Sequence, residues 1–98
     1  MNETIIEEAA RITSSVRERE YGHPGLHHAA TAKVFAAYLE RTGKPLAELD
    51  AVDLEVGMML DKIMRFANQR KRDSLVDIVG YARCAERVLA ATDPDFKD

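Results

Sequence analysis

The chain has 98 residues, of which 46% are hydrophobic and 32% charged, and its net charge is −3. A chain this short lies near the lower limit for burying a self-sufficient core, so we expect one soluble domain that forms a homo-oligomer, a dimer or a tetramer. The acidic balance offers little of the counterion release that drives duplex nucleic-acid binding, and no apolar run approaches the ~20 residues of a membrane span. We therefore expect a cytoplasmic protein that binds neither duplex nucleic acid nor a membrane.

The first half of the chain predicts two helices separated by a turn. The first helix covers about residues 4–18, because apolar residues recur there at the spacing of one helical face, namely Ile5, Ala9, Ile12 and Val16. Two glycines and a proline within residues 21–25 then end this helix. A second helix is predicted over about residues 26–41, with Gly43 beyond its end.

The second half of the chain predicts a helical hairpin. A third helix is expected over about residues 50–69, begun by a capping box of Asp50 and Asp53, and a fourth over about residues 73–91. The linker at residues 70–72 is so short that these two helices must pack as an antiparallel pair. The apolar residues expected on their inner faces are Val56, Met59, Leu60, Ile63, Phe66, Leu75, Val79, Ala82 and Leu89.

These elements predict an all-α fold, a single four-helix bundle-like domain over residues 1–98 with an ordered part at about residues 4–91. The polar, proline-broken tail at residues 92–98 is expected to be flexible. The single cysteine, Cys84, lies within the fourth helical pattern, and we interpret it as a small buried filler.

Charged residues of the predicted hairpin form the main candidate site. The acidic pair, Asp73 and Asp77, is four residues apart on one helical face, so a positive group is expected between the two carboxylates. If the hairpin turns near residue 71, the cation pair of the third helix, Lys62 and Arg65, comes within reach. Arg65 is then level with Asp77, and Lys62 with Gly80, where the missing side chain either lets the helices approach closely or leaves room for a ligand.

Two interpretations of these charges stay open. One is an interhelical salt-bridge cluster that fixes the register of the hairpin and adds little net stability. The other is a polyphosphate site, in which the acidic pair holds Mg²⁺ and the cation pair neutralises phosphate oxygens. Such a site can activate water for in-line attack. Asp61 and Tyr81 lie at the same depth in the hairpin.

The histidines of the chain, His23, His27 and His28, do not favour a transition-metal site. His27 and His28 are adjacent, so on a helix they point about 100° apart and cannot easily share an ion. His27 shares a stripe with Thr31, and the two make a polar wall that could face the charged hairpin. His27 can be a structural residue or a residue of the site, and both interpretations stay open.

Three segments of the chain form a series of motifs. They are Arg17 with Tyr21-Gly22-His23-Pro24, Val56 through Met59 leading to Lys62-Ile63-Met64-Arg65, and Asp73-Ser74-Leu75-Val76-Asp77 with Gly80-Tyr81. In this order and spacing, over about residues 5–90, they resemble a family of small, mostly phage and prophage proteins of unassigned function that are commonly described as MazG-like.

The resemblance implies an all-α fold similar to that of the nucleoside triphosphate pyrophosphohydrolases, which hydrolyse NTPs or dNTPs to the monophosphate and pyrophosphate with Mg²⁺. Asp73 and Asp77 resemble the acidic pair on the later metal-binding helix of those enzymes, which implies a catalytic and metal-binding role. The residues with an implied substrate-binding role are Lys62, Arg65, Arg17, Tyr21, His27 and Tyr81.

The chain departs from that pattern at two places. The enzymes also carry a Glu-x-x-Glu pair on the preceding helix, where this chain has only Asp53, Glu55 and Asp61, with the cation pair where acids are expected. His27 stands where relatives tend to carry Asn, and either side chain can hydrogen-bond a base or a ribose. Three hypotheses therefore stay open: a Mg²⁺-dependent pyrophosphohydrolase, a non-catalytic binder of a nucleotide or other phosphorylated small molecule, and a purely structural oligomeric bundle.

Overall fold

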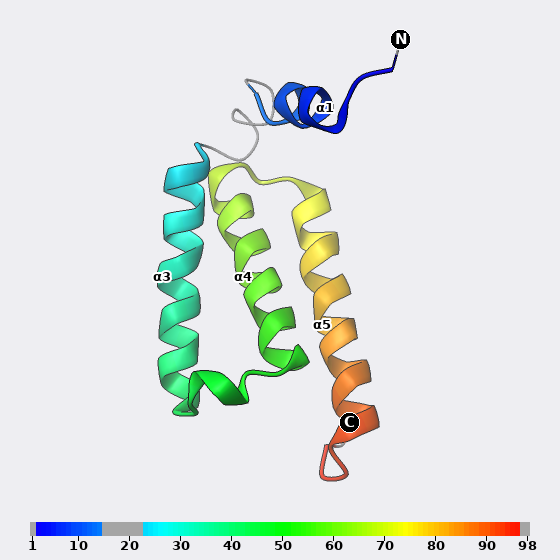
Figure 1. Cartoon of the computed structure of the whole chain (residues 1–98). Helices are drawn as coiled ribbons and strands as arrows, with labels where there is room; N and C mark the ends of the chain where they lie inside the picture. Colours follow the sequence, from blue (N-terminus) through cyan, green and yellow to red (C-terminus); the bar gives the residue numbers. More distant parts are fainter. Residues whose placement is uncertain (1, 15–22, 97–98) are drawn as a thin grey trace.

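The computed structural model describes residues 2–14 and 23–96, and within these ranges it contains helices and no strand. The elements are α1 (Ile5–Ile12), α3 (Pro24–Thr42), the short 3₁₀ helix η1 (Leu46–Glu48), α4 (Ala51–Asn68) and α5 (Arg72–Thr92). Figure 1 shows that α3 and α4 run antiparallel, and that α4 and α5 do so as well. The prediction of an all-α chain that ends in an antiparallel hairpin is confirmed.

Side-chain caps set the helix ends that the sequence indicated. At the start of α1, Thr4 Oγ1 accepts from the Glu7 N–H at 3.1 Å, and the Glu7 carboxylate accepts from the Thr4 N–H at 3.0 Å. Asp50 and Asp53 form the same reciprocal pair at the start of α4, at 3.0 Å in both directions. Gly43 ends α3 with φ at 70°, in the left-handed region that favours glycine.

Two helix boundaries differ from the predicted ones. The first helix ends at Ile12, not near residue 18, because the hydroxyls of Thr13 and Ser14 donate to carbonyls of the preceding turn at 2.6 and 2.9 Å. Such local hydrogen bonds compete with the continuation of a helix. The helix after the turn begins at Pro24, two residues earlier than predicted, since proline suits the first helical position and His23 Nδ1 caps the amide of residue 25 at 3.0 Å.

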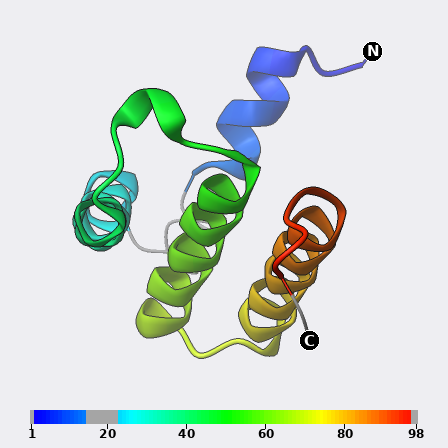
Figure 2. The same ribbon diagram turned by 90° about the horizontal axis from the view of Figure 1, so that it is seen from below.

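The three long helices stand side by side in one layer, with α4 in the middle. Figure 2, which views the layer along the helix axes, shows α3 on one side of α4 and α5 on the other. Contacts between elements are most extensive between α4 and α5, followed by those between α3 and α4. The helices follow the up-and-down order of a bundle, and α1 lies beyond one end of the layer (Figure 1). This layer positions the candidate site on the α4–α5 hairpin.

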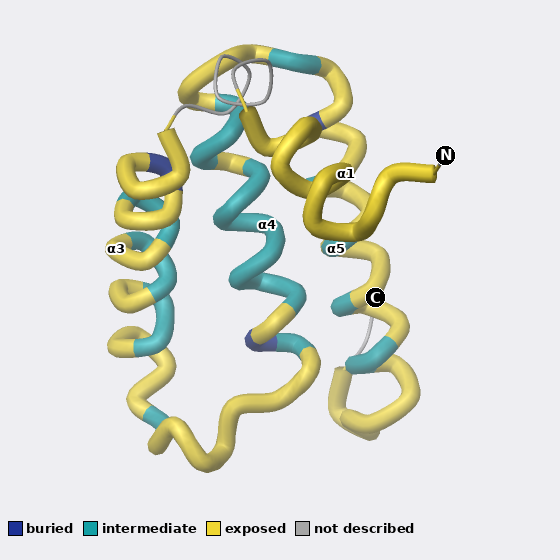
Figure 3. Tube along the Cα trace, turned by 45° about the horizontal axis from the view of Figure 1, so that its top comes forward, coloured by how far each residue is buried: buried dark blue, intermediate teal, exposed yellow. Residues whose placement is uncertain are grey.

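The most buried residues of the described chain are polar. No apolar side chain among the described residues is buried, whereas His27, Asp53 and Ser74 are. Figure 3 shows α4 as the most covered helix and α1 as exposed throughout. The apolar residues of α4 are mostly half-buried. A single layer of helices covers its central member on two sides only, which accounts for this incomplete burial.

The predicted inner face of α5 is wrong at Leu75, Val79 and Ala82, whereas Leu89 is half-buried as expected. Leu75 and Val79 are 48% and 61% exposed, and Ala82 is exposed as well. Apolar residues occur on more than one side of this helix, so their periodicity did not tell which side meets α4. The buried and half-buried residues of α5 are Ser74, Ile78, Tyr81, Ala85, Val88 and Leu89.

Among the glycines that the structure describes, the closest approach of two helices occurs at Gly57, where α4 meets α3. A Cβ atom at Gly57 would lie 3.1 Å from Cζ of Phe35, whose ring stacks on that of Tyr38 with centroids 6.1 Å apart. Gly80, by contrast, has open space where its Cβ would be, with nothing within 4 Å. Of the two possibilities considered for Gly80, the structure shows the open space and not the close approach.

We predict that Gly80→Ala stabilises the protein more than Gly57→Ala does. Replacing a glycine inside a helix by alanine gains about 0.5–1 kcal/mol through backbone entropy, and nothing opposes this gain at Gly80. At Gly57 the new methyl group presses on the Phe35 ring, so part or all of the gain is lost. Urea unfolding of both variants measures the difference, and equal stabilisation would contradict the packing at Gly57.

Candidate functional site

Charged side chains of α4 and α5 meet on one face of the hairpin, which we call the charged face. Lys62 Nζ lies 3.2 Å from Asp77 Oδ2, so an ion pair joins the two helices. The Lys62 side chain is 16% exposed and that of Asp77 is 47% exposed, so the carboxylate is the partner that is open to solvent. A cross-hairpin ion pair between the cation pair and the acidic pair is therefore present, as the sequence indicated.

The register of the hairpin differs from the predicted one. We expected Arg65 to be level with Asp77, but Lys62 makes the ion pair with this carboxylate. Helix α4 ends at residue 68 and α5 begins at residue 72, so the hairpin turns near residue 70 and not near residue 71. Arg65 Nε lies instead 3.1 Å from Oδ2 of Asp61, one turn earlier on the same helix. The prediction of Arg65 beside Asp77 is corrected accordingly.

The Asp61 carboxylate also connects α4 to α3. His27 Nε2 lies 2.8 Å from Asp61 Oδ1, and the Thr31 hydroxyl donates to the same oxygen at 3.3 Å. An ionised carboxylate only accepts hydrogen bonds, so Nε2 of His27 carries the proton in this contact. The His27 side chain is only 5% exposed. The expected polar wall of His27 and Thr31 against the charged hairpin is confirmed.

The other predicted site residues lie at different depths. Asp73 is exposed in the first turn of α5, one turn before Asp77. Tyr81 is half-buried, and because it follows the buried Ser74 by seven residues, it lies on the side of α5 that meets α4. Arg17 and Tyr21 lie outside the described residues.

The acidic pair is the group on the charged face whose oxygen atoms have the chemistry of Mg²⁺ ligands. In residues 2–14 and 23–96, no three side chains of His, Cys, Asp or Glu gather in a way that could hold a metal ion. Asp73 and Asp77 supply two carboxylates on successive turns of α5. These are hard oxygen donors, and Mg²⁺ commonly takes one or two of them and fills its other positions with water and substrate oxygens. The pair therefore suits part of the coordination shell of such an ion.

A second polar cluster surrounds Asp53, at the start of α4. Its Oδ1 accepts from the Tyr38 hydroxyl at 2.7 Å, its Oδ2 is paired with Lys44, and Asp50 completes the cap. The hydrogen bond from Lys44 holds the pKa of Asp53 well below its usual range, although Asp53 is only 3% exposed. Burial, together with the hydrogen bond to Asp53, raises the pKa of Tyr38 to about 12. The sequence indicated only the cap formed by Asp50 and Asp53. A covered tyrosine hydroxyl needs a hydrogen-bond partner, so Tyr38 was the residue that could have indicated this cluster.

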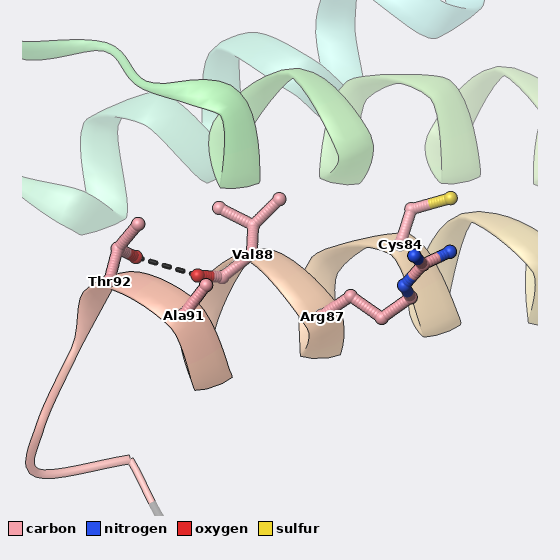
Figure 4. Close-up of a pocket in the computed structure, with 5 residues that line it drawn as sticks. All are labelled: Cys84, Arg87, Val88, Ala91 and Thr92. Atoms are coloured by element: carbon pink, nitrogen blue, oxygen red, sulfur yellow. Dashed lines mark hydrogen bonds between the residues drawn. The ribbon is translucent and has the colours of Figure 1, made fainter.

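An open hollow of about 440 Å³ lies along α5 beyond the acidic pair (Figure 4). The residues that line it are Cys84, Arg87, Val88, Ala91 and Thr92. Cys84 is exposed, so its interpretation as a buried filler is wrong. It follows Asp77 by seven residues and thus lies on the same side of α5 as that carboxylate. Arg87 adds a cation to this hollow that we did not predict. Its spacing of seven residues from Gly80 places both residues on one stripe of α5, and this spacing was the signal that could have indicated it.

Comparison with protein families decides where the chain belongs. A model of the family described as domain of unknown function (DUF6378) matches residues 4–89. The chain belongs to this family. Relatives of this DUF6378 member are called Gene 55 protein in two phages. That of Mycobacterium phage D29 is 39% identical over 89 residues, which cover 90% of the chain and 55% of the relative. That of Mycobacterium phage L5 is 33% identical over 94 residues, which cover 95% and 57%.

The DUF6378 member thus spans about half the length of the curated relatives it matches. These phage names and the family description support the expected relationship to phage proteins of unassigned function. No solved structure matches the chain. In the part of the chain that the structure describes, no helix has the length and apolar character needed to cross a membrane.

We predict that Asp53→Asn destabilises this DUF6378 member strongly at neutral pH and little in acid. The pKa of Asp53 is lower in the folded chain than in the unfolded one, so its stabilisation is complete above the unfolded value of about 4 and is lost as the pH falls below it. At pH 7 the variant should melt on the order of 5 °C below the wild type. Thermal unfolding at several pH values tests this, with the exposed Asp95→Asn as the control. A difference between wild type and Asp53→Asn that does not narrow in acid would contradict the prediction.

Proposed function

We propose that the chain binds the polyphosphate of a nucleotide together with Mg²⁺ and hydrolyses it in the host cytoplasm, as the MazG-like nucleoside triphosphate pyrophosphohydrolases do. The observation that supports this best is the Lys62–Asp77 ion pair with the exposed Asp73 one turn away. A salt bridge that only fixed the hairpin would need one carboxylate. A second carboxylate four residues away on the same helix costs a few tenths of a kcal/mol unless a cation balances its charge.

Asp73 and Asp77 would hold the metal ion, and the chemistry of their oxygen atoms suits it. Both carboxylates are on the solvent-accessible side of the charged face, where water and phosphate oxygens can complete the coordination. The bound ion would neutralise phosphate charge and lower the pKa of a bound water. Glu-x-x-Glu, the further acidic pair of the enzymes, has no counterpart on α4, so we propose a site for one ion.

Lys62 and Arg65 would bind the phosphate oxygens in two different ways. Lys62 pairs with a half-exposed carboxylate, and it would exchange this partner for a phosphate oxygen. Arg65 is held by Asp61, which is itself held by His27 from α3. A guanidinium oriented in this way is well suited to a bidentate contact with a phosphate.

The nucleotide end of the substrate would lie against the remaining candidate residues. We propose that His27 acts mainly as a positioning residue, since its Nε2 is used on Asp61. The base and the sugar would be enclosed by His27 together with Arg17, Tyr21 and Tyr81. The specificity for one nucleotide would then depend on contacts near α3 and not on the metal ligands.

A second candidate function is a non-catalytic binder of a nucleotide or another phosphorylated small molecule. It is favoured by the state of the carboxylates on α4, because Asp53 is engaged by Lys44 and Tyr38, and Asp61 by His27 and Arg65. These engaged carboxylates are poorly placed to serve a metal ion. A protein with the same cations and no turnover would use Lys62 and Arg65 for phosphate alone.

We predict that Asp77→Asn abolishes pyrophosphate release while leaving the protein folded. Removing a metal ligand should lower the rate by at least about 100-fold, because even residues that only support ligands contribute 10–100-fold. The measurement is a thermal-shift screen of common NTPs and dNTPs with and without Mg²⁺, followed by detection of pyrophosphate in each well. Asp95→Asn, the same change at an exposed position beyond α5, is the matched control.

The three hypotheses give different results in this screen. Mg²⁺-dependent stabilisation with pyrophosphate release that Asp77→Asn abolishes is the result expected of the enzyme. Stabilisation without Mg²⁺ and without product would identify the binder. No stabilisation by any phosphate compound would leave the salt-bridged structural bundle, and turnover that survives in Asp77→Asn would remove the metal assignment.

A further inference from the structure

The chain exposes much more surface than a compact monomer of its mass. Its accessible area is 7672 Å², whereas a folded monomer of this size exposes about 5,600 Å². Its radius of gyration is 16.4 Å, against about 13 Å for a compact domain of this length. Globular domains bury their apolar faces between at least two layers of secondary structure, and the long helices described here form one. The chain thus exposes about 2,000 Å² more than a compact monomer would.

An apolar patch of the hairpin lies on the outer face of α5. Leu75, Val76 and Val79 are 48%, 50% and 61% exposed there, and with Arg72 they line an open hollow of about 400 Å³. Ser74, two residues before Val76, is buried against α4. Two residues correspond to about 200° of helical rotation, so Val76 points away from α4.

We infer that a second copy of the chain covers this outer face, with the two α5 helices antiparallel about a twofold axis at Val79. The occupant is identified by charge complementarity. In this arrangement residues at equal distances before and after Val79 oppose each other across the axis. Arg72, seven residues before it, meets Glu86 of the partner subunit, seven residues after it. Symmetry repeats the pair, so two ion pairs flank the apolar centre.

The available area suits such a dimer. Obligate homodimers bury about 2,000–5,000 Å² in total, or about 1,000–2,500 Å² per subunit, which matches the excess of about 2,000 Å². Both Arg72 and Glu86 are exposed and belong to the same side of α5 as Val79. The charged face stays open, because Asp77 lies two residues from Val79 and therefore points to nearly the opposite side of the helix. The dimer does not depend on the proposed hydrolysis.

The first test is the mass of the wild type and of Val79→Asp by sedimentation equilibrium at micromolar concentrations. The wild type should have twice the mass of the 11.0 kDa chain, and Val79→Asp should raise the dissociation constant at least about 100-fold. Leu54→Asp is the matched control, because Leu54 is 62% exposed on α4. Leu54 precedes Asp61 by seven residues, so it lies on the charged side of the hairpin. A monomeric wild type, or a dimer that Val79→Asp leaves intact or Leu54→Asp dissociates equally, overturns the inference.

A second measurement applies if Val79→Asp fails to fold. Val79→Cys, in a chain whose own thiol is removed by Cys84→Ser, places two thiols beside the twofold axis. A short thiol-reactive cross-linker should then join two chains, whereas Leu54→Cys in the same background should stay single. Equal cross-linking of both variants, or none at residue 79, overturns the twofold arrangement.

Charge reversal tests the register of the two helices. Arg72→Glu and Glu86→Arg should each raise the dissociation constant about tenfold, since each turns two attractive pairs into repulsive ones. The double variant restores opposite charges in both pairs and should dimerise nearly as well as the wild type. A double variant that is as weak as the single ones overturns the pairing about Val79.

Discussion

The carboxylate of Asp61 receives contacts from two helices at once, and the arrangement of the charged face depends on it. His27 and Thr31 reach it from α3, and Arg65 reaches it from the next turn of α4. A carboxylate in this half-buried position would be costly without such partners. Because Asp61 is satisfied in this way, it holds Arg65 on its own helix and leaves Lys62 to make the ion pair with α5.

The same contact explains why polar residues are the most buried ones in a chain with many apolar residues. His27 and Asp53 lie at the two ends of the contact between α3 and α4, and each has a hydrogen-bonded partner. Between them, Phe35 packs over Gly57, which brings the helices close together. The hydrogen bonds thus fix how α3 lies on α4, while much of the apolar surface remains available for burial by another layer.

The sequence was informative about each helix and much less about how helices meet. Capping residues such as Asp50 and Gly43 fix helix ends by local hydrogen bonds and local backbone geometry, so those boundaries could be predicted. The inner face of α5 could not, because Leu75 and Val79 are spaced as residues of one helical face, and so are the half-buried Ile78, Tyr81 and Ala85. Periodicity gives a stripe on a helix and does not say what covers it.

The candidate site shows the same division. The acidic pair and the cation pair were identified by spacing within each helix, and their presence on one hairpin followed from the short linker. Which cation meets which carboxylate depends on where the turn is centred. The predicted centre was one residue too late in the chain, so Arg65 was assigned to Asp77, whereas Lys62 makes this ion pair. The contacts of Asp61 were hidden because its partners His27 and Thr31 are 34 and 30 residues away along the chain.

The three residues between α4 and α5 limit how the chain can change in length. Surface connections ordinarily tolerate insertions, since the entropy of loop closure grows slowly with length. One residue added to this linker as an extension of the first turn of α5 would rotate the rest of that helix by about 100° relative to α4 and carry Asp77 away from Lys62. The connection between α3 and α4 has no such constraint except at Lys44, which is tied to Asp53. Insertions and deletions should therefore be accommodated after Lys44, and the α4–α5 linker should keep its length.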